Sequence, residues 1–428
     1  MVILSFGVRQ LRAVCVGVVA VLVLAGCGGR PEGVLAPVAL TAQGTSLVDI
    51  GVATTRLRSD KPGVIFSGER GSQLDFANIV VSIPPEQVRK VGEVQWPKKL
   101  PGNPATDFVT VKAEDMTLAQ AKTWFNKRIV RTPGRQALVF IHGFNNQFDD
   151  AVYRFAQIVH DSHSDVVPVL FTWPSRGSLL AYGYDRESTN YSRDALEKLL
   201  SSLAADPNVG EISILAHSMG NWVTIEALRQ MAIRNGRIAP KIKNVMLASP
   251  DVDVDVFRSQ MADIGPKRPN FTLFVSQDDR ALAASRRIWG NVERLGQINP
   301  TLEPYKSQLA AENVTVIDLT DLKTADKLNH GKFAESPQVV QAIGLRLAQG
   351  QTITDSRIGL GDRIIAASAG AAATVGTAAG LVVAAPVAIV DPNTRKNFDQ
   401  NVEAFGDQVS DSAAATGDAI KSTTDVGQ

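Results

Sequence analysis

Residues Ile212 to Gly220 read ISILAHSMG. The apolar run at the start of this stretch predicts a buried strand, and a helix is expected to begin near Asn221. A serine on the sharp turn between such a strand and helix needs small residues two positions before and two positions after it. Ala216 and Gly220 meet this demand, although Ala216 stands where glycine is more usual. The stretch therefore predicts that Ser218 is a nucleophile, with an ordinary serine in a strand-to-helix turn as the alternative.

From residue 137 onward, short apolar runs alternate with longer segments of helical period, which favours βαβ units and a mostly parallel sheet with helices on both faces. Strands are predicted at Val48–Thr54, Ala77–Ile83, Ala137–Ile141, Val167–Thr172, Ile212–Ala216, Ile242–Ala248, Phe271–Val275 and Val314–Ile317, and helices at 149–161, 192–204, 219–235, 281–294 and 337–347. Together with the turn at Ser218, these elements predict the α/β-hydrolase fold. No insertion is long enough for a large lid domain.

A second apolar strand ends in Ile141-His142-Gly143-Phe144. In this fold the loop after that strand supplies one backbone N–H to the oxyanion hole, and the residue after the nucleophile supplies the other. Phe144 and Met219 are the expected donors. His142 is interpreted as structural, because it precedes the serine and the fold orders its triad serine, acid, histidine.

The general base is expected at His330. The chain has five histidines, at 142, 160, 163, 217 and 330. Only His330 follows both the serine and the candidate acids, whereas His217 is adjacent to the serine and cannot turn back to its Oγ. A solvated loop histidine is the alternative interpretation of His330.

Asp279 is the expected acid, because it follows the predicted strand Phe271–Val275 at the position where many α/β hydrolases carry the carboxylate of the triad. Asp278 is the neighbouring alternative. Asp251, after the preceding strand, is a further alternative, since some proteins of this fold take the acid from there.

Residues from about 47 to 350 resemble a bacterial α/β-hydrolase family of unknown function. The resemblance is carried by Ile141-His142-Gly143-Phe144-Asn145-Asn146, Phe171-Thr172-Trp173-Pro174-Ser175, Ala216-His217-Ser218-Met219-Gly220 and Ala248-Ser249-Pro250-Asp251. It implies the fold and a Ser-Asp-His triad, but no substrate. Trp173 is interpreted as a core residue, with a pocket wall as the alternative. Residues 176–193 are predicted to be either a loop over the site or a solvated connection.

The N-terminus is typical of a lipoprotein signal peptide, predicted over residues 1–26. Arg9 and Arg12 precede an uncharged apolar run, and Leu24-Ala25-Gly26-Cys27 resembles a lipobox. Cys27 is the expected lipidation site, followed by a flexible tether over residues 27–46. Since glycine rather than aspartate follows Cys27, we expect a lipid anchor in the outer membrane, facing the periplasm. A single signal-anchor helix is the alternative, although the apolar run is short for a span.

Residues 351–428 form an Ala/Gly-rich segment and a polar tail. The uncharged stretch 364–390 has two interpretations: a membrane-associated span or hairpin, and a flexible or self-packing tail. The formal net charge of +1 gives no basis for a nucleic-acid partner. No cofactor and no metal site are predicted, and the i, i+3 pair His160 and His163 is interpreted as surface histidines. The sequence carries no indication of oligomeric state.

Two functions fit these features. The first is a serine hydrolase of the lipase or esterase kind, acting on acyl esters of small molecules or lipids through an acyl-enzyme, with amide and thioester bonds as alternatives. The second is a catalytically silent envelope lipoprotein that keeps the fold as a binding or structural module. A binding module has no use for a strained turn at Ser218, so the residues favour the hydrolase.

Overall fold

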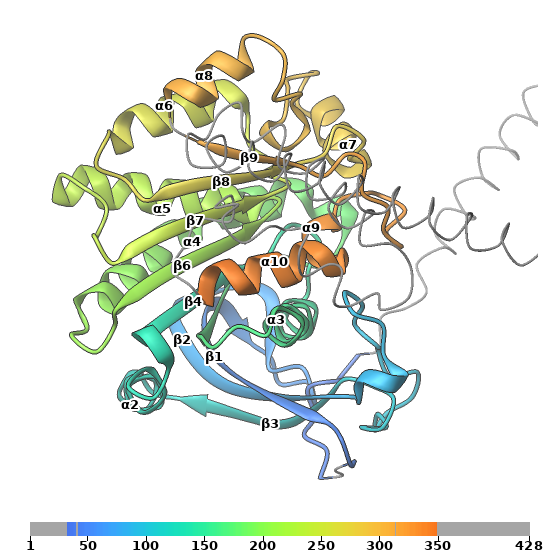
Figure 1. Ribbon diagram of the computed structural model, residues 1–428. Helices are drawn as coiled ribbons and strands as arrows, with labels where there is room; N and C mark the ends of the chain where they lie inside the picture. The colour runs from blue at the N-terminus through green and yellow to red at the C-terminus, as the bar shows by residue number, and fades with distance from the viewer. Residues whose placement is uncertain (1–31, 40–41, 313, 349–428) are drawn as a thin grey trace, which may run out of the picture.

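The computed structural model describes residues 32–39, 42–312 and 314–348, which build one nine-stranded sheet (Figure 1). The strand order is β3-β2-β1-β5-β4-β6-β7-β8-β9. The strands are β1 (Ser46–Arg58), β2 (Phe66–Ile83), β3 (Val109–Met116), β4 (Gln136–Ile141), β5 (Val167–Thr172), β6 (Glu211–His217), β7 (Ile242–Ala248), β8 (Asn270–Val275) and β9 (Thr315–Asp318). The predicted signal peptide, Cys27 and the stretch 364–390 lie outside the described residues.

The sheet is parallel from β1 through β5, β4, β6, β7 and β8 to β9, whereas β1, β2 and β3 form an antiparallel meander at one edge. The central strands are buried on both faces, as their apolar runs require. Because parallel strands end at the same edge of a sheet, the loops after β4, β6, β7 and β8 all meet there. This arrangement confirms the predicted α/β-hydrolase fold.

Helices cover both faces of the sheet (Figure 1). One face packs against α2 (Leu118–Ile129), α4 (Tyr182–Ala205), α5 (Gly220–Asn235), α6 (Val254–Ile264) and α8 (Tyr305–Ala311). The other face packs against α3 (Phe148–Ser162), α9 (Lys332–Glu335) and α10 (Pro337–Ala348). The short helix α7 (Arg280–Ile288) follows β8 at the edge where the parallel strands end.

The predicted strands are present, but several helices differ from the expectation. α4 begins at Tyr182, ten residues before the predicted start, so residues 182–193 are helix rather than loop. α7 ends at Ile288, because Gly290 adopts a positive φ of 73° soon after it. Strand β3 and helices α2, α6, α8 and α9 were not predicted. No insertion interrupts the described residues with a separate lid domain.

The first described residues pack on the domain, although they belong to the predicted tether. Val34 and Leu35 are 3% and 1% exposed, and the hydroxyl of Tyr153 donates to the carbonyl of Val34 (3.0 Å). Burying these two apolar side chains stabilises the segment against the core. This part of residues 27–46 is therefore not a free tether. Among the helices of the described residues, none has the length and apolar character needed to cross a bilayer.

We predict that Gly344→Ala destabilises the fold by about 1–3 kcal/mol, because the added Cβ would overlap the backbone carbonyl of Ser162 where α10 packs on α3. Gly183, in the first turn of α4, has open space around its Cα. The matched change Gly183→Ala should leave stability unchanged or raise it by up to about 1 kcal/mol. Urea unfolding measures both variants, and equal stabilities would show that the α3–α10 contact is not tight.

Candidate active site

Ser218 lies on a strained turn between β6 and α5. Its φ of 52° is in the left-handed region, which L-residues rarely adopt. Its carbonyl oxygen accepts hydrogen bonds from the backbone N–H (3.1 Å) and side chain (2.8 Å) of Asn221 and from the backbone N–H of Asp251 (3.2 Å). These three hydrogen bonds hold the peptide after Ser218 in place and offset the strain.

The loop after β4 lies directly against this turn. A Cβ on Gly143 would come within 2.8 Å of the Ser218 Cβ, and a Cβ on Gly220 would overlap the carbonyl oxygen of His142. Both glycines are therefore required by the close approach of two backbones. This contact brings the sequence-predicted residues Phe144, Ser218 and Met219 together.

The peptide planes of the two predicted oxyanion donors are both fixed. The Gly143 carbonyl accepts from the Nδ1–H of His142 (2.8 Å) and from Asn146 (3.3 Å), so the N–H of Phe144, on the opposite side of the same trans peptide, points away from them. The Ser218 carbonyl is held in the same way by Asn221 and Asp251, which fixes the N–H of Met219. Rigid N–H groups of this kind suit an oxyanion hole.

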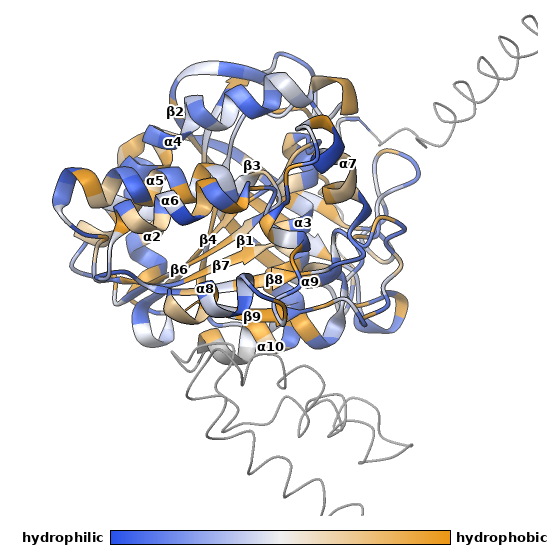
Figure 2. Cartoon of the chain, turned by 90° about the horizontal axis from the view of Figure 1, so that it is seen from above, coloured by the Kyte–Doolittle hydropathy of each residue, from blue (hydrophilic) through white to orange (hydrophobic). Residues whose placement is uncertain are grey.

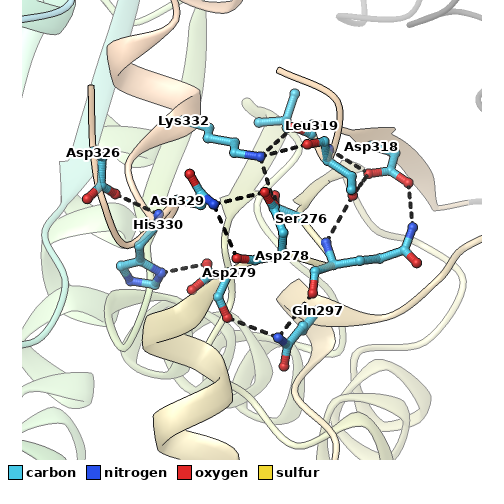
Figure 3. Close-up of polar contacts among 12 residues, drawn as sticks. Ser276, Asp278, Asp279, Gln297, Asp318, Leu319, Asp326, Asn329, His330 and Lys332 are labelled. Carbon is cyan, nitrogen blue, oxygen red and sulfur yellow. Dashed lines mark hydrogen bonds and ion pairs between the residues drawn. The ribbon is translucent and has the colours of Figure 1, made fainter. Parts of the chain in front are cut away.

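His330 and Asp279 form a hydrogen-bonded pair beside the turn (Figure 3). The His330 Nδ1 lies 2.7 Å from Asp279 Oδ2, and the Asp279 side chain is completely buried. The other carboxylate oxygen of Asp279 accepts from the backbone N–H of Leu282 (2.9 Å) and caps α7. The carbonyl of His330 accepts from Ser249 Oγ (3.1 Å), which follows β7. The hydrogen bonds of the described residues include none between Ser218 Oγ and the His330 ring; such contacts often tighten only when substrate binds.

The loop that carries His330 is held by Asp326, which sequence reasoning missed (Figure 3). Its Oδ2 accepts from the backbone N–H groups of His330 (2.7 Å) and Gly331 (2.9 Å), and its Oδ1 accepts from that of Leu328 (2.8 Å). An aspartate that accepts from backbone groups two to five residues later is typical of a tight turn. The sequence Asp326-Lys327-Leu328-Asn329 carries this signal.

The two alternative acids have other partners. Asp278 accepts from the buried Lys332 ammonium (2.8 Å) and from Asn329 (2.9 Å), and it lies next to Asp279 without contacting His330 (Figure 3). Asp251 accepts from Ser285 Oγ (2.6 Å) and from the hydroxyl of Tyr182 (2.8 Å). Of the three predicted carboxylates, the structure pairs Asp279 with His330.

Burial and Asp279 act on the pKa of His330 in opposite directions. Burial lowers this pKa, while the charge of Asp279 and its hydrogen bond raise it, and the net result is a pKa above the ordinary value of 6.5. His330 therefore becomes the neutral base only as the pH rises through this raised value.

His217 contacts both the backbone and the ring of His330. Its Nε2–H donates to the carbonyl oxygen of His330 (3.3 Å), and its ring packs against the His330 ring with centroids 4.7 Å apart. Burial and the nearby His330 hold the pKa of His217 well below 6.5, so this ring stays neutral. It positions the loop, as expected for a histidine that cannot reach the Ser218 Oγ.

His142 is a core residue, in agreement with its interpretation as structural. It is 1% exposed and stacks on Trp173, with ring centroids 4.9 Å apart. Burial and the neighbouring charge of Arg56 lower the pKa of His142 to about 3. Trp173 is fully buried and donates to the His142 carbonyl (2.8 Å), so it belongs to the core rather than to a pocket wall.

Arg56 is a second feature that the sequence did not predict. Its side chain is fully buried beneath the loop after β4, where the guanidinium donates to the backbone carbonyls of Asn146 (2.8 Å), Ser175 (2.9 Å) and Ser67 (3.1 Å). Burial lowers its pKa to about 10, so the group remains charged at neutral pH. Arg56 ties the loop of Phe144 to the ends of β1, β2 and β5.

The start of α4 forms one wall beside the site. Tyr182 packs edge-on against Phe144, with ring centroids 5.0 Å apart, and its hydroxyl accepts from the indole N–H of Trp289 (2.9 Å). Of the paired histidines, His163 is exposed, but His160 is half-buried against Arg89 and Asp161, so its interpretation as a surface residue was wrong. No group of three or more potential metal ligands occurs among the residues that the structure describes.

A mostly parallel sheet with helices on both faces, and a strained serine turn at the edge where its strands end, define an α/β hydrolase. A family described as "Alpha/beta hydrolase of unknown function (DUF900)" matches residues 117–346, which is more than half of the chain. The chain belongs to this family. It is also similar to uncharacterized protein alr1448 of Nostoc sp. (strain PCC 7120), with 24% identity over 151 residues. That match covers 29% of this chain and 39% of the relative.

We predict that Asp279→Asn lowers the pKa of His330, because the change removes the largest of the carboxylate charges that raise this pKa and leaves the burial that lowers it. Asp278→Asn is the matched control, and the His330 pKa should stay above 6.5 in that variant. Histidine-selective NMR titration measures both values. An unchanged His330 pKa in Asp279→Asn would contradict the pairing.

Proposed function

We propose that this protein is a serine hydrolase that cleaves carboxylic esters, with Ser218 as nucleophile, His330 as general base and Asp279 as the acid of the triad. The observation that carries the proposal is the buried Asp279–His330 pair at the sheet edge where Ser218 occupies its strained turn. Strain of this kind persists where the surrounding structure enforces it, and it is concentrated at functional sites.

The chemistry follows from the proposed roles. Asp279 accepts the Nδ1–H of His330, which leaves the Nε2 lone pair free to take the proton of Ser218 Oγ as this oxygen attacks the ester carbonyl. The backbone N–H groups of Phe144 and Met219 stabilise the resulting oxyanion. His330 then gives its proton to the departing alcohol. Water, activated by His330, releases the acid from the acyl-enzyme.

The cellular setting is part of the proposal and is supported by the sequence. The lipobox-like Leu24-Ala25-Gly26-Cys27 favours export and lipid attachment at Cys27, in the outer membrane and facing the periplasm. An acyl ester of a small molecule or a lipid is the proposed substrate class.

We expect a fluorophosphonate probe to label the full-length chain, because such probes react with activated serines. Labelling should vanish in Ser218→Ala and fall about a hundredfold or more in His330→Ala. The exposed Ser202 and His163 offer controls, and Ser202→Ala and His163→Ala should label like the wild type. A well-folded wild type that does not label would instead favour the silent binding module.

The three carboxylates should differ in their effect on turnover. Asp279→Asn is expected to lower kcat for a short-chain p-nitrophenyl ester on the order of ten-thousandfold, as in serine proteases that lose this group. Asp278→Asn and Asp251→Asn each weaken an ion pair, with Lys332 and Arg294 respectively, but remove no contact with His330, so their kcat should fall by far less than that of Asp279→Asn. A larger loss in either control than in Asp279→Asn would assign the acid to that residue.

A further inference from the structure

Large apolar side chains are exposed around the candidate active site. Leu179 and Leu180, just before α4, are 68% and 99% exposed, and Ile288 and Trp289, at the end of α7, are 61% and 43% exposed. Val292 and Leu328 are also exposed. Large apolar side chains that gather on one face of a soluble protein mark interaction sites.

Contacts among the segments that carry these side chains connect them to the site. Trp289 donates to the hydroxyl of Tyr182, three residues after Leu179, and Tyr182 packs on Phe144 of the loop beside Ser218. Leu328 lies two residues before His330, and its carbonyl accepts from the N–H that begins α7 (2.8 Å). We call residues 179–180, 288–292 and 328 the apolar rim.

The apolar rim also carries cationic side chains. Arg286 and Arg287 are exposed in the last turn of α7, next to Ile288, and the nearest exposed acid in sequence is Glu293. Figure 2 shows that α7 presents both hydrophobic and strongly hydrophilic residues. Exposed aromatic and aliphatic groups flanked by arginines suit the interface of a membrane with anionic lipids.

The chain outside the described residues is attached near the same rim. Glu32, the first described residue, lines a cavity of 190 Å³ together with Arg176, which lies three residues before Leu179. Cys27 precedes Glu32 by five residues, a fully extended length of at most about 18 Å. A lipid on Cys27 would therefore hold the bilayer near the sheet edge that carries Ser218, rather than near the opposite edge.

We propose that the apolar rim is a docking face for an anionic lipid bilayer, and that the hydrolase takes its ester substrate from that surface. Leu179, Leu180 and Trp289 enter the headgroup region, while Arg286 and Arg287 contact lipid phosphates. The substrate part of this inference rests on the proposed function, whereas the docking part can be tested without turnover.

The test uses full-length protein in vesicles of phosphatidylethanolamine and phosphatidylglycerol, with a nitroxide on a single introduced thiol. Cys15 and Cys27 are the only cysteines of the sequence. The protein without an introduced cysteine, treated with the same nitroxide reagent, measures the background signal from these two residues. Leu180→Cys reports on the rim. Ile233→Cys is the matched control, since this exposed residue (60%) lies near the end of α5, where the chain has returned to the opposite edge of the sheet.

The nitroxide at position 180 should be accessible to oxygen and shielded from a water-soluble nickel reagent, whereas the nitroxide at 233 should show the reverse. Replacing Arg286 and Arg287 with alanine should lower the vesicle partition coefficient about fivefold per arginine. Nitroxides that are accessible to the nickel reagent at both positions would overturn the proposal. Dipolar broadening between copies at position 180 without lipid would also overturn it, in favour of self-association.

Fluorophosphonate labelling of the same variants separates the two proposals. Leu180, Arg286 and Arg287 belong neither to the proposed triad nor to the loop after β4. In Leu180→Cys and in the variant with both arginines replaced by alanine, Ser218 should therefore label at the wild-type rate in solution. Docking without labelling would reject the serine hydrolase and keep the lipid-binding face. Labelling without docking would keep the serine hydrolase and reject the lipid-binding face.

Discussion

The structure depends on the contact between the loop after β4 and the turn after β6. The two strands are parallel neighbours, with Ile141 opposite Ala216, so their ends arrive side by side. The backbone of the loop after β4 contacts the backbone of the turn after β6, and a side chain at position 143 or 220 would overlap the neighbouring segment, so both positions require glycine. The contact sets Phe144 beside Ser218 without a side chain between them. A methyl group at either glycine would separate the two peptide groups on which an oxyanion hole would depend.

The elements around this contact are held by hydrogen bonds to backbone groups. Asn221 fixes the carbonyl of Ser218, Asp326 fixes the N–H groups around His330, and Arg56 gathers the carbonyls beneath Phe144. Each of these side chains lies on a different segment. The geometry of the site is therefore set by the fold as a whole, which explains how a serine with a φ of 52° is maintained.

The sequence predicted the parallel sheet because buried strands such as Val167–Thr172 are continuous apolar runs, and it predicted the turn at Ser218 because small residues flank the serine. It did not predict α2 or the early start of α4. Their amphipathic or polar sequences become helical through tertiary contacts, such as Tyr182 with Asp251. The role of Arg56 was hidden, since its backbone partners at Asn146 and Ser175 are far from it in sequence. The role of Asp326 depends on backbone groups only two to five residues later, so its signal was present in the sequence but was missed.

Three carboxylates near one edge of the sheet have different roles because their partners differ. Asp278 is paired with Lys332, and Asp251 binds two hydroxyl groups and the buried Arg294, and neither makes a hydrogen bond to the His330 ring. Asp279 uses one oxygen to cap α7 and the other to bind His330. The start of α7 and the orientation of His330 are thus set by the same side chain. Because α7 ends beside Trp289, Asp279 also links the geometry of the proposed triad to the apolar rim.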